Sequence, residues 1–288
     1  MPRSRPGKAP PLASHAGAVP RVALGNRGER AATALSLGLA TAFLTVVVAL
    51  PIAALVWESK RDGLHAFWQI VTEPDAVAAL KLTFVTAFLV TVINAVLGTI
   101  TAWVLVRDDF HGKSLVNSVI DLPFALPTIV AGLTLLTLYG PRSPVGIDIA
   151  FTRTAIVLAL LFVTLPFVIR AVQPVLIELD VEMEEAARSL GAGQLTVFRR
   201  IVLPNILPGI LSGCVLAFAR ALGEIGSLVL VAGTLPHTTV ASLFVFNLIQ
   251  DGESSQAAAV AIVLLVVAFV VLLAVGALRF FVTRYDRA

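Results

Sequence analysis

The chain has 288 residues, of which 58% are hydrophobic and only 14% charged, and its mean hydropathy is +0.93. An average soluble domain carries about a quarter of charged residues, so this composition excludes an ordinary soluble domain and a disordered chain. The formal net charge is +3, and the basic residues flank long apolar segments, where they orient membrane helices rather than bind nucleic acid. A single cysteine, Cys214, excludes an intrachain disulfide and a thiolate metal site. The composition therefore predicts a multi-pass membrane protein.

The chain begins with a basic segment, residues 1–30, that contains six Lys and Arg residues and one acidic residue. The next 27 residues, 31–57, are mostly apolar and show no short apolar stretch followed by a small-residue cleavage site. This pattern favours a retained anchor over a removable signal peptide. We expect a cytoplasmic tail followed by a first transmembrane anchor.

Five further segments are long enough to cross a bilayer, which takes about 20 apolar residues in a helix. They are residues 79–106, 115–139, 154–177, 205–232 and 257–282. On one side of the resulting six-span arrangement, the tails and loops hold 14 Lys and Arg residues, against four on the other side. The excess of positive charge on the cytoplasmic side predicts that both termini and the loop 179–204 are cytoplasmic.

Residues 225–250 are apolar enough to contain a seventh span. Gly233, Pro236 and His237 interrupt this segment, and an odd number of spans would put the basic C-terminus outside. We therefore predict an all-α protein of about six transmembrane helices, within a range of five to seven, with a short outer-face helix after the fifth span.

The loop 179–204 is predicted to form a helix-turn-helix. Apolar residues recur at helical spacing from Met183 to Leu190, and acidic residues crowd the start of this first helix, where its dipole favours them. Gly191 is expected to end it in the left-handed conformation, and Pro204 to end a second short helix. The exposed alanines of this loop suit either the bilayer surface or the groove of a partner protein. Alanine burial gives little membrane affinity, at about 25 cal/mol per Å², so a partner protein is favoured.

This loop resembles the EAA loop of bacterial ABC importer permeases, whose pattern is EAA, three residues, G, nine residues, and I-x-L-P. The residues that match it are Glu185, Ala186, Ala187, Gly191, Ile201, Leu203 and Pro204. The resemblance implies a coupling helix that docks into separate ATPase subunits, two of them, which bind the ATP and Mg²⁺. It also implies that a type I importer transmembrane domain covers about residues 75–283, followed by a short tail, 284–288.

Two further motifs resemble sulfate and thiosulfate permeases of the CysT type. They are Asp121–Thr128 with Val130–Leu133, and Arg220–Ser227. This resemblance implies a bacterial inner-membrane permease for sulfate or thiosulfate, with a second, homologous permease subunit and an extracytoplasmic sulfate-binding protein as partners. Molybdate and tungstate permeases carry a similar second motif, so another oxyanion is the alternative substrate.

Charged residues fall inside the predicted spans. Arg220 and Glu224 are spaced to share one face of the fifth span. Each would cost about 2.5 to 3.5 kcal/mol at the bilayer centre, so they should face protein or water. They belong either to the translocation pathway or its gate, where Arg220 can meet an oxyanion, or to a structural ion pair. The second role is favoured because Glu224 would repel sulfate. The same choice applies to Asp121.

Other intramembrane residues are predicted to have structural roles. Arg170 lies near the end of a span, where a long side chain reaches the interface. Asn94 and the pair Gly209 and Gly213, which has GxxxG spacing, are expected to serve helix packing.

No catalytic constellation is present in the sequence. Gly112-Lys113-Ser114 resembles the end of a phosphate-binding loop but lacks the glycine five residues earlier and the preceding strand. We therefore expect no enzyme activity, cofactor or metal on this chain. The rival class is an ion-coupled secondary carrier, which usually shows repeated halves, and a membrane scaffold is a weaker alternative. No internal repeat was found.

Overall fold

The computed structural model describes residues 26–233, 235 and 237–285, and every regular element within them is helical. This confirms the predicted all-α fold. Most of the predicted N-terminal tail and residues 286–288 lie outside the described residues. The chain divides into two units, residues 1–52 and 53–288, which are described separately.

The first unit contains the predicted anchor. α1 (Asn26–Leu44) begins inside the segment that was assigned to the tail. It continues through the π-helical turn η1 (Thr45–Ala49) into α2 (Leu50–Glu58), whose last residues belong to the second unit. The helical stretch Ala31–Glu58 is apolar and, with 28 residues, long enough to span a membrane.

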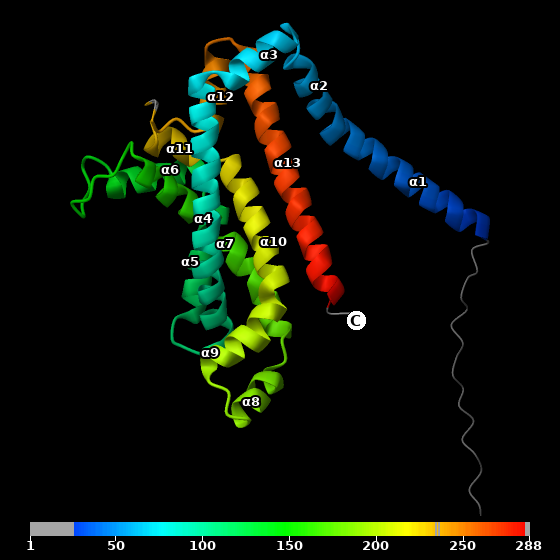
Figure 1. Ribbon diagram of the computed structural model, residues 1–288, viewed down its shortest axis with the longest axis vertical. Helices are drawn as coiled ribbons and strands as arrows, with labels where there is room; N and C mark the ends of the chain where they lie inside the picture. The colour runs from blue at the N-terminus through cyan, green and yellow to red at the C-terminus, as the bar shows by residue number, and fades with distance from the viewer. Residues whose placement is uncertain (1–25, 234, 236, 286–288) are drawn as a thin grey trace, which may run out of the picture. The chain divides into compact units, whose positions relative to one another are not determined.

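The core of the second unit is formed by three long helices that lie side by side (Figure 1). They are α4 (Pro74–Arg107), α7 (Arg153–Glu178) and α10 (Leu203–Leu222). Short α3 (Gly63–Thr72) precedes α4, and long α13 (Ser254–Tyr285) ends the unit. Figure 1 shows α3 at one end of this unit and α8 (Val181–Ser189) at the other.

Small and polar residues set the contacts of α7, as predicted. An ideal Cβ on Gly213 would lie 2.7 Å from the Val168 Cα, so α10 approaches the α7 backbone directly. An ideal Cβ on Gly209 would lie 3.0 Å from the Ala171 carbonyl oxygen. Buried Asn94 of α4 donates a 2.7 Å hydrogen bond from Nδ2 to the Thr164 hydroxyl of α7.

Replacing Gly213 by alanine should lower the thermal unfolding midpoint of the detergent-solubilised protein. The added methyl group meets backbone atoms that cannot move aside, and such overpacking costs about 1 to 3 kcal/mol. Gly276 of α13 is a matched control, since no atom lies within 4 Å of its ideal Cβ. Gly276→Ala should not lower the midpoint, and equal midpoints for both variants would contradict the packing role.

The predicted third span, 115–139, is not one continuous helix. The segment forms α5 (Lys113–Ala125) and α6 (Thr128–Tyr139), which meet at 113°. Pro127 excludes helical backbone at the residue before it, and Leu126 is accordingly extended, with ψ 133°. The described residues thus contain five helices that can cross a membrane, or six if the bent pair is one span.

The predicted fifth span, 205–232, is also shifted. A helical path runs from Gln194 to Leu222 through α9 (Gln194–Val197), the π-helical turn η2 (Phe198–Val202) and α10. Pro204 does not end the second loop helix as predicted. In the wider turn before it, the Leu203 N–H donates to the Phe198 carbonyl five residues back, and the proline then occupies the first turn of α10, where it needs no donor.

Two short helices follow instead of a seventh span. α11 (Gly226–Val231) has six residues, and α12 (Ala241–Gln250) has ten. α12 lies near α3 at one end of the unit (Figure 1), in agreement with the predicted short helix after the fifth span.

Candidate functional site

The predicted coupling helix is α8, at one end of the second unit. The Asp180 carboxylate caps its start and accepts a 2.9 Å hydrogen bond from the Glu182 N–H. Gly191 ends it with φ +85°, in the left-handed region, as predicted. The Gly191 N–H then donates to the Arg188 carbonyl, and the Ala192 N–H to that of Ala187. Local sequence alone therefore forms this helix and closes it.

One face of α8 and the following turn is apolar and open. Met183 and Ala186 are exposed, Leu190 is 89% exposed, and Leu195 of α9 is 69% exposed. Glu185 is exposed beside them. We call the apolar residues Met183, Ala186, Leu190 and Leu195 the docking stripe. Its small and medium side chains suit the groove of another protein.

The other residues of the EAA pattern are more buried or lie at the start of α10. Ala187, Ile201 and Leu203 are half-buried and pack against the core cluster that contains Val202 and Ile206. Pro204 is exposed. The second half of the pattern therefore joins the loop to the span, and only its first half forms the open surface.

The buried residue of α8, Glu184, is not among the predicted site residues. Glu184 is 1% exposed and forms ion pairs with Arg107, at the end of α4, and with Arg188. The Arg107 Nη2 lies 2.8 Å from Glu184 Oε1. In the sequence, Arg107 directly follows the predicted span 79–106, and Glu184 is one of several acids at the start of a helix. No local signal distinguishes Glu184 from the exposed acids beside it, because charged residues away from the apolar stripe of a helix are usually solvated.

Arg220 and Glu224 form the predicted ion pair, but not on one helix. α10 ends at Leu222, and Glu224 lies in the break before α11. The Arg220 Nη1 is 2.7 Å from Glu224 Oε2; the glutamate is 1% exposed and the arginine 32%. Glu224 Oε1 accepts hydrogen bonds from the N–H (2.8 Å) and hydroxyl (3.0 Å) of Ser227. The carboxylate thus connects α10 to the first turn of α11.

The two CysT-like motifs, far apart in sequence, meet in space. α6 carries Gly132 of the first motif, and an ideal Cβ there would lie 2.7 Å from the Ser227 Cα and carbonyl oxygen of the second. An ideal Cβ on Gly226 would overlap the Thr128 hydroxyl and lie 3.0 Å from the Ile129 nitrogen. α6 and α11 are therefore packed backbone to backbone, and larger side chains at these glycines would push them apart.

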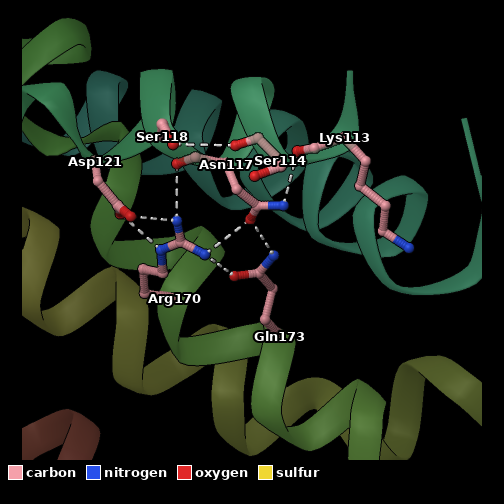
Figure 2. A network of polar contacts seen from close by, with 7 residues as sticks. All are labelled: Lys113, Ser114, Asn117, Ser118, Asp121, Arg170 and Gln173. Carbon is pink, nitrogen blue, oxygen red and sulfur yellow. Dashed lines mark hydrogen bonds and ion pairs between the residues drawn. The ribbon is translucent and has the colours of Figure 1, made fainter. Parts of the chain in front are cut away.

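Asp121 belongs to a polar network that joins α5 to α7 (Figure 2). The Arg170 Nε and Nη2 donate to its two carboxylate oxygens, at 2.8 and 2.7 Å. Arg170 also donates to the Asn117 side chain and carbonyl, at 3.1 and 3.0 Å, and to the side chain of Gln173. The prediction that Arg170 simply reaches to the interface is wrong, because a bidentate carboxylate partner is available.

The chain was compared with known proteins. Residues 94–287 match the family model of binding-protein-dependent transport system inner membrane components. The chain is 44% identical to the sulfate transport system permease protein CysT of Synechocystis sp., over 84% of this chain and 88% of that one. It is 40% identical to CysT of Salmonella typhimurium, over 88% and 93%.

Solved structures share the fold at low sequence identity. A bacterial alginate ABC transporter in complex with its pentasaccharide-bound periplasmic protein matches with a TM-score of 0.73 and 20% identity, over 88% of this chain and 95% of that one. The MetNI methionine ABC transporter matches with a TM-score of 0.56 and 20% identity, over 75% and 96%. On the family match and the close relatives, the chain belongs to the family of binding-protein-dependent transport system inner membrane components.

Proposed function

We propose that this chain is a permease subunit of an ATP-driven ABC importer that carries sulfate or thiosulfate across the bacterial cytoplasmic membrane. The observation that carries the proposal is the identity of 40 to 44% with CysT permeases over most of both chains. The close packing of α6 on α11 supports it, since both motifs that resemble CysT contribute to that contact.

The proposed cycle needs partners on both sides of the membrane. An extracytoplasmic sulfate-binding protein delivers the anion, and a second, homologous permease completes the pathway. Two ATPase subunits bind and hydrolyse ATP and Mg²⁺ at the cytoplasmic face. They drive transport by binding one conformation of the permeases more tightly than the other.

The docking stripe with Glu185 is the surface proposed for the ATPase. Support comes from its exposure on a helix that is otherwise anchored by a buried charge. The excess of Lys and Arg in the same loop and in both tails supports their cytoplasmic location. The transmembrane domain is proposed to cover about residues 75–283, with 31–57 as an additional anchor.

The intramembrane ion pairs are proposed to hold the broken segments rather than to bind the anion. The pair of Arg220 and Glu224 bridges the break between α10 and α11. The pair of Arg170 and Asp121 joins α5 to α7, just before the bend between α5 and α6. In both pairs the carboxylate already neutralises the arginine. If the break between α10 and α11 or the bend between α5 and α6 moves during transport, the ion pair beside it acts in the gate.

Uptake and co-purification measurements test both the substrate and the class of transporter. Cells that lack this chain should lose uptake of labelled sulfate but keep that of molybdate, and the complemented cells should recover it. The tagged chain should co-purify with an ATPase in fixed stoichiometry. Loss of molybdate uptake alone would identify the alternative oxyanion, and sulfate uptake without any ATPase would support a secondary carrier.

A further inference from the structure

Glu184 stands out among the charged residues because it is buried on a surface helix. All nine residues of α8 are described, and Glu184 is the one that is buried. Its side chain is 1% exposed. An ionised carboxylate is costly in such a place unless it is paired, so its partners define its role.

Arg107 is the principal partner and belongs to a different helix. Its Nε and Nη2 donate to Glu184 Oε1, at 3.1 and 2.8 Å. Nη2 also donates to the Leu179 carbonyl at 3.4 Å, and the guanidinium lies 5.9 Å from the Trp103 ring. One guanidinium therefore connects the end of α4, the end of α7 and α8.

The second carboxylate oxygen has a weaker, local partner. Arg188 of α8 donates to Glu184 Oε2 at 3.3 Å and is half exposed. This contact lies within one helix and ties α8 to nothing else. The polar connection from α8 to α4 therefore depends on Oε1 and Arg107.

The backbone between α7 and α8 is short and extended. Leu179 and Asp180, with ψ of 121° and 119°, separate the two helices. α8 can turn about these two residues, and the ion pair resists that turn. α4, to which the pair is attached, is 34 residues long and packs on α7 and α10. A force on α4 at Arg107 therefore acts on the core of the second unit.

We infer that the Arg107–Glu184 ion pair passes the movement of α8 to α4, and that both are positioning residues of the transport cycle. This inference rests on the proposed function, since it takes α8 as the element that the ATPase holds. The docking stripe is exposed, whereas Glu184 faces the transmembrane unit. Loss of the pair should therefore leave the ATPase bound but poorly coupled to transport.

The test is a double-mutant cycle on the assembled transporter. The chain with its ATPase subunits is reconstituted in proteoliposomes, with sulfate-loaded binding protein outside, and labelled sulfate imported per ATP hydrolysed is measured. Glu184→Gln and Arg107→Gln should each lower this ratio about tenfold, a typical size for coupling between sites. The double variant should be no worse than either single one, because the two residues act as a unit.

Glu178→Gln is the matched control, with the same change on an exposed residue at the end of α7, outside the docking stripe, and it should keep the wild-type ratio. The inference is overturned if the single variants keep that ratio, or if their effects multiply in the double variant. Arg107→Lys keeps the charge but replaces the two-nitrogen fork by a single ammonium, so it should retain more of the ratio than Arg107→Gln. If the single glutamine variants do not assemble, the double variant, which leaves neither charge of the pair, is compared with the wild type, and a wild-type ratio overturns the inference. A wild-type chain that retains no ATPase would refute the proposed function itself.

Discussion

Replacing Gly191 by valine should separate the permease from its ATPase subunits and abolish ATP-driven sulfate uptake. Gly191 has φ +85°, which a β-branched residue adopts only at a cost of about 1 to 3 kcal/mol. Its N–H and that of Ala192 close the end of α8. If the backbone leaves this conformation, α8 no longer keeps its angle to α9, and the docking stripe is divided.

Strain rather than crowding is the expected cause, since no atom lies within 4 Å of an ideal Cβ at Gly191. Gly191→Asn should therefore retain most of the uptake, because asparagine tolerates the left-handed region. Gly193→Ala is a second control, at a residue with φ −69° and equal space. Co-purified ATPase and the amount of permease in the membrane are the measurements. A valine variant that binds ATPase normally would contradict the docking role.

The helix α8 and its end at Gly191 could be predicted because their signals are local. The apolar spacing from Met183 to Leu190 sets its face, and a glycine at the right position sets its end. Each of these signals acts over a few residues, so packing elsewhere did not override them.

The prolines at 123 and 127 indicate a turn inside the third span, but its size could not be predicted from the sequence. Hydropathy measures length and composition, and residues 115–139 are apolar whether or not the helix is continuous. Pro127 interrupts the helix, and the packing of α6 on α11, through Gly132 and Ser227, holds the bent arrangement. Such a contact between distant segments cannot be read from the periodicity of either one.

The ion pairs between helices were missed for the same reason. Arg170 and Asp121 are 49 residues apart, and Arg107 and Glu184 are 77 apart. In the sequence, each of these residues has an adequate local explanation, as a span-end cation or a helix-start acid. Only the arrangement of α5 against α7 and of α8 against α4 brings the opposite charges together. The prediction for Pro204 failed for a different reason. The π-helical turn η2 before it lets the helix continue past the proline, so the usual rule that proline ends a helix does not hold there.

Replacing Glu224 by glutamine should strongly reduce both the amount of folded permease and sulfate uptake. Removing one partner of a buried ion pair costs about 3 to 5 kcal/mol, because the remaining charge is left uncompensated. Arg220 is 32% exposed, which favours the lower value. Glutamine can still accept from the N–H and hydroxyl of Ser227, so the effect isolates the charge. Folded protein is measured by size-exclusion chromatography after extraction, and uptake with labelled sulfate.

The double variant Arg220→Gln with Glu224→Gln separates the two roles of this pair. It removes both charges, so no uncompensated charge stays in the membrane, and the amount of folded protein should recover. If the pair only holds α10 to α11, as we propose, uptake should recover with it. Full folding without uptake would instead show that Arg220 meets the anion. The comparison is decisive because Glu224 is 1% exposed and bound to Ser227, so only the arginine has a surface that a passing sulfate can reach.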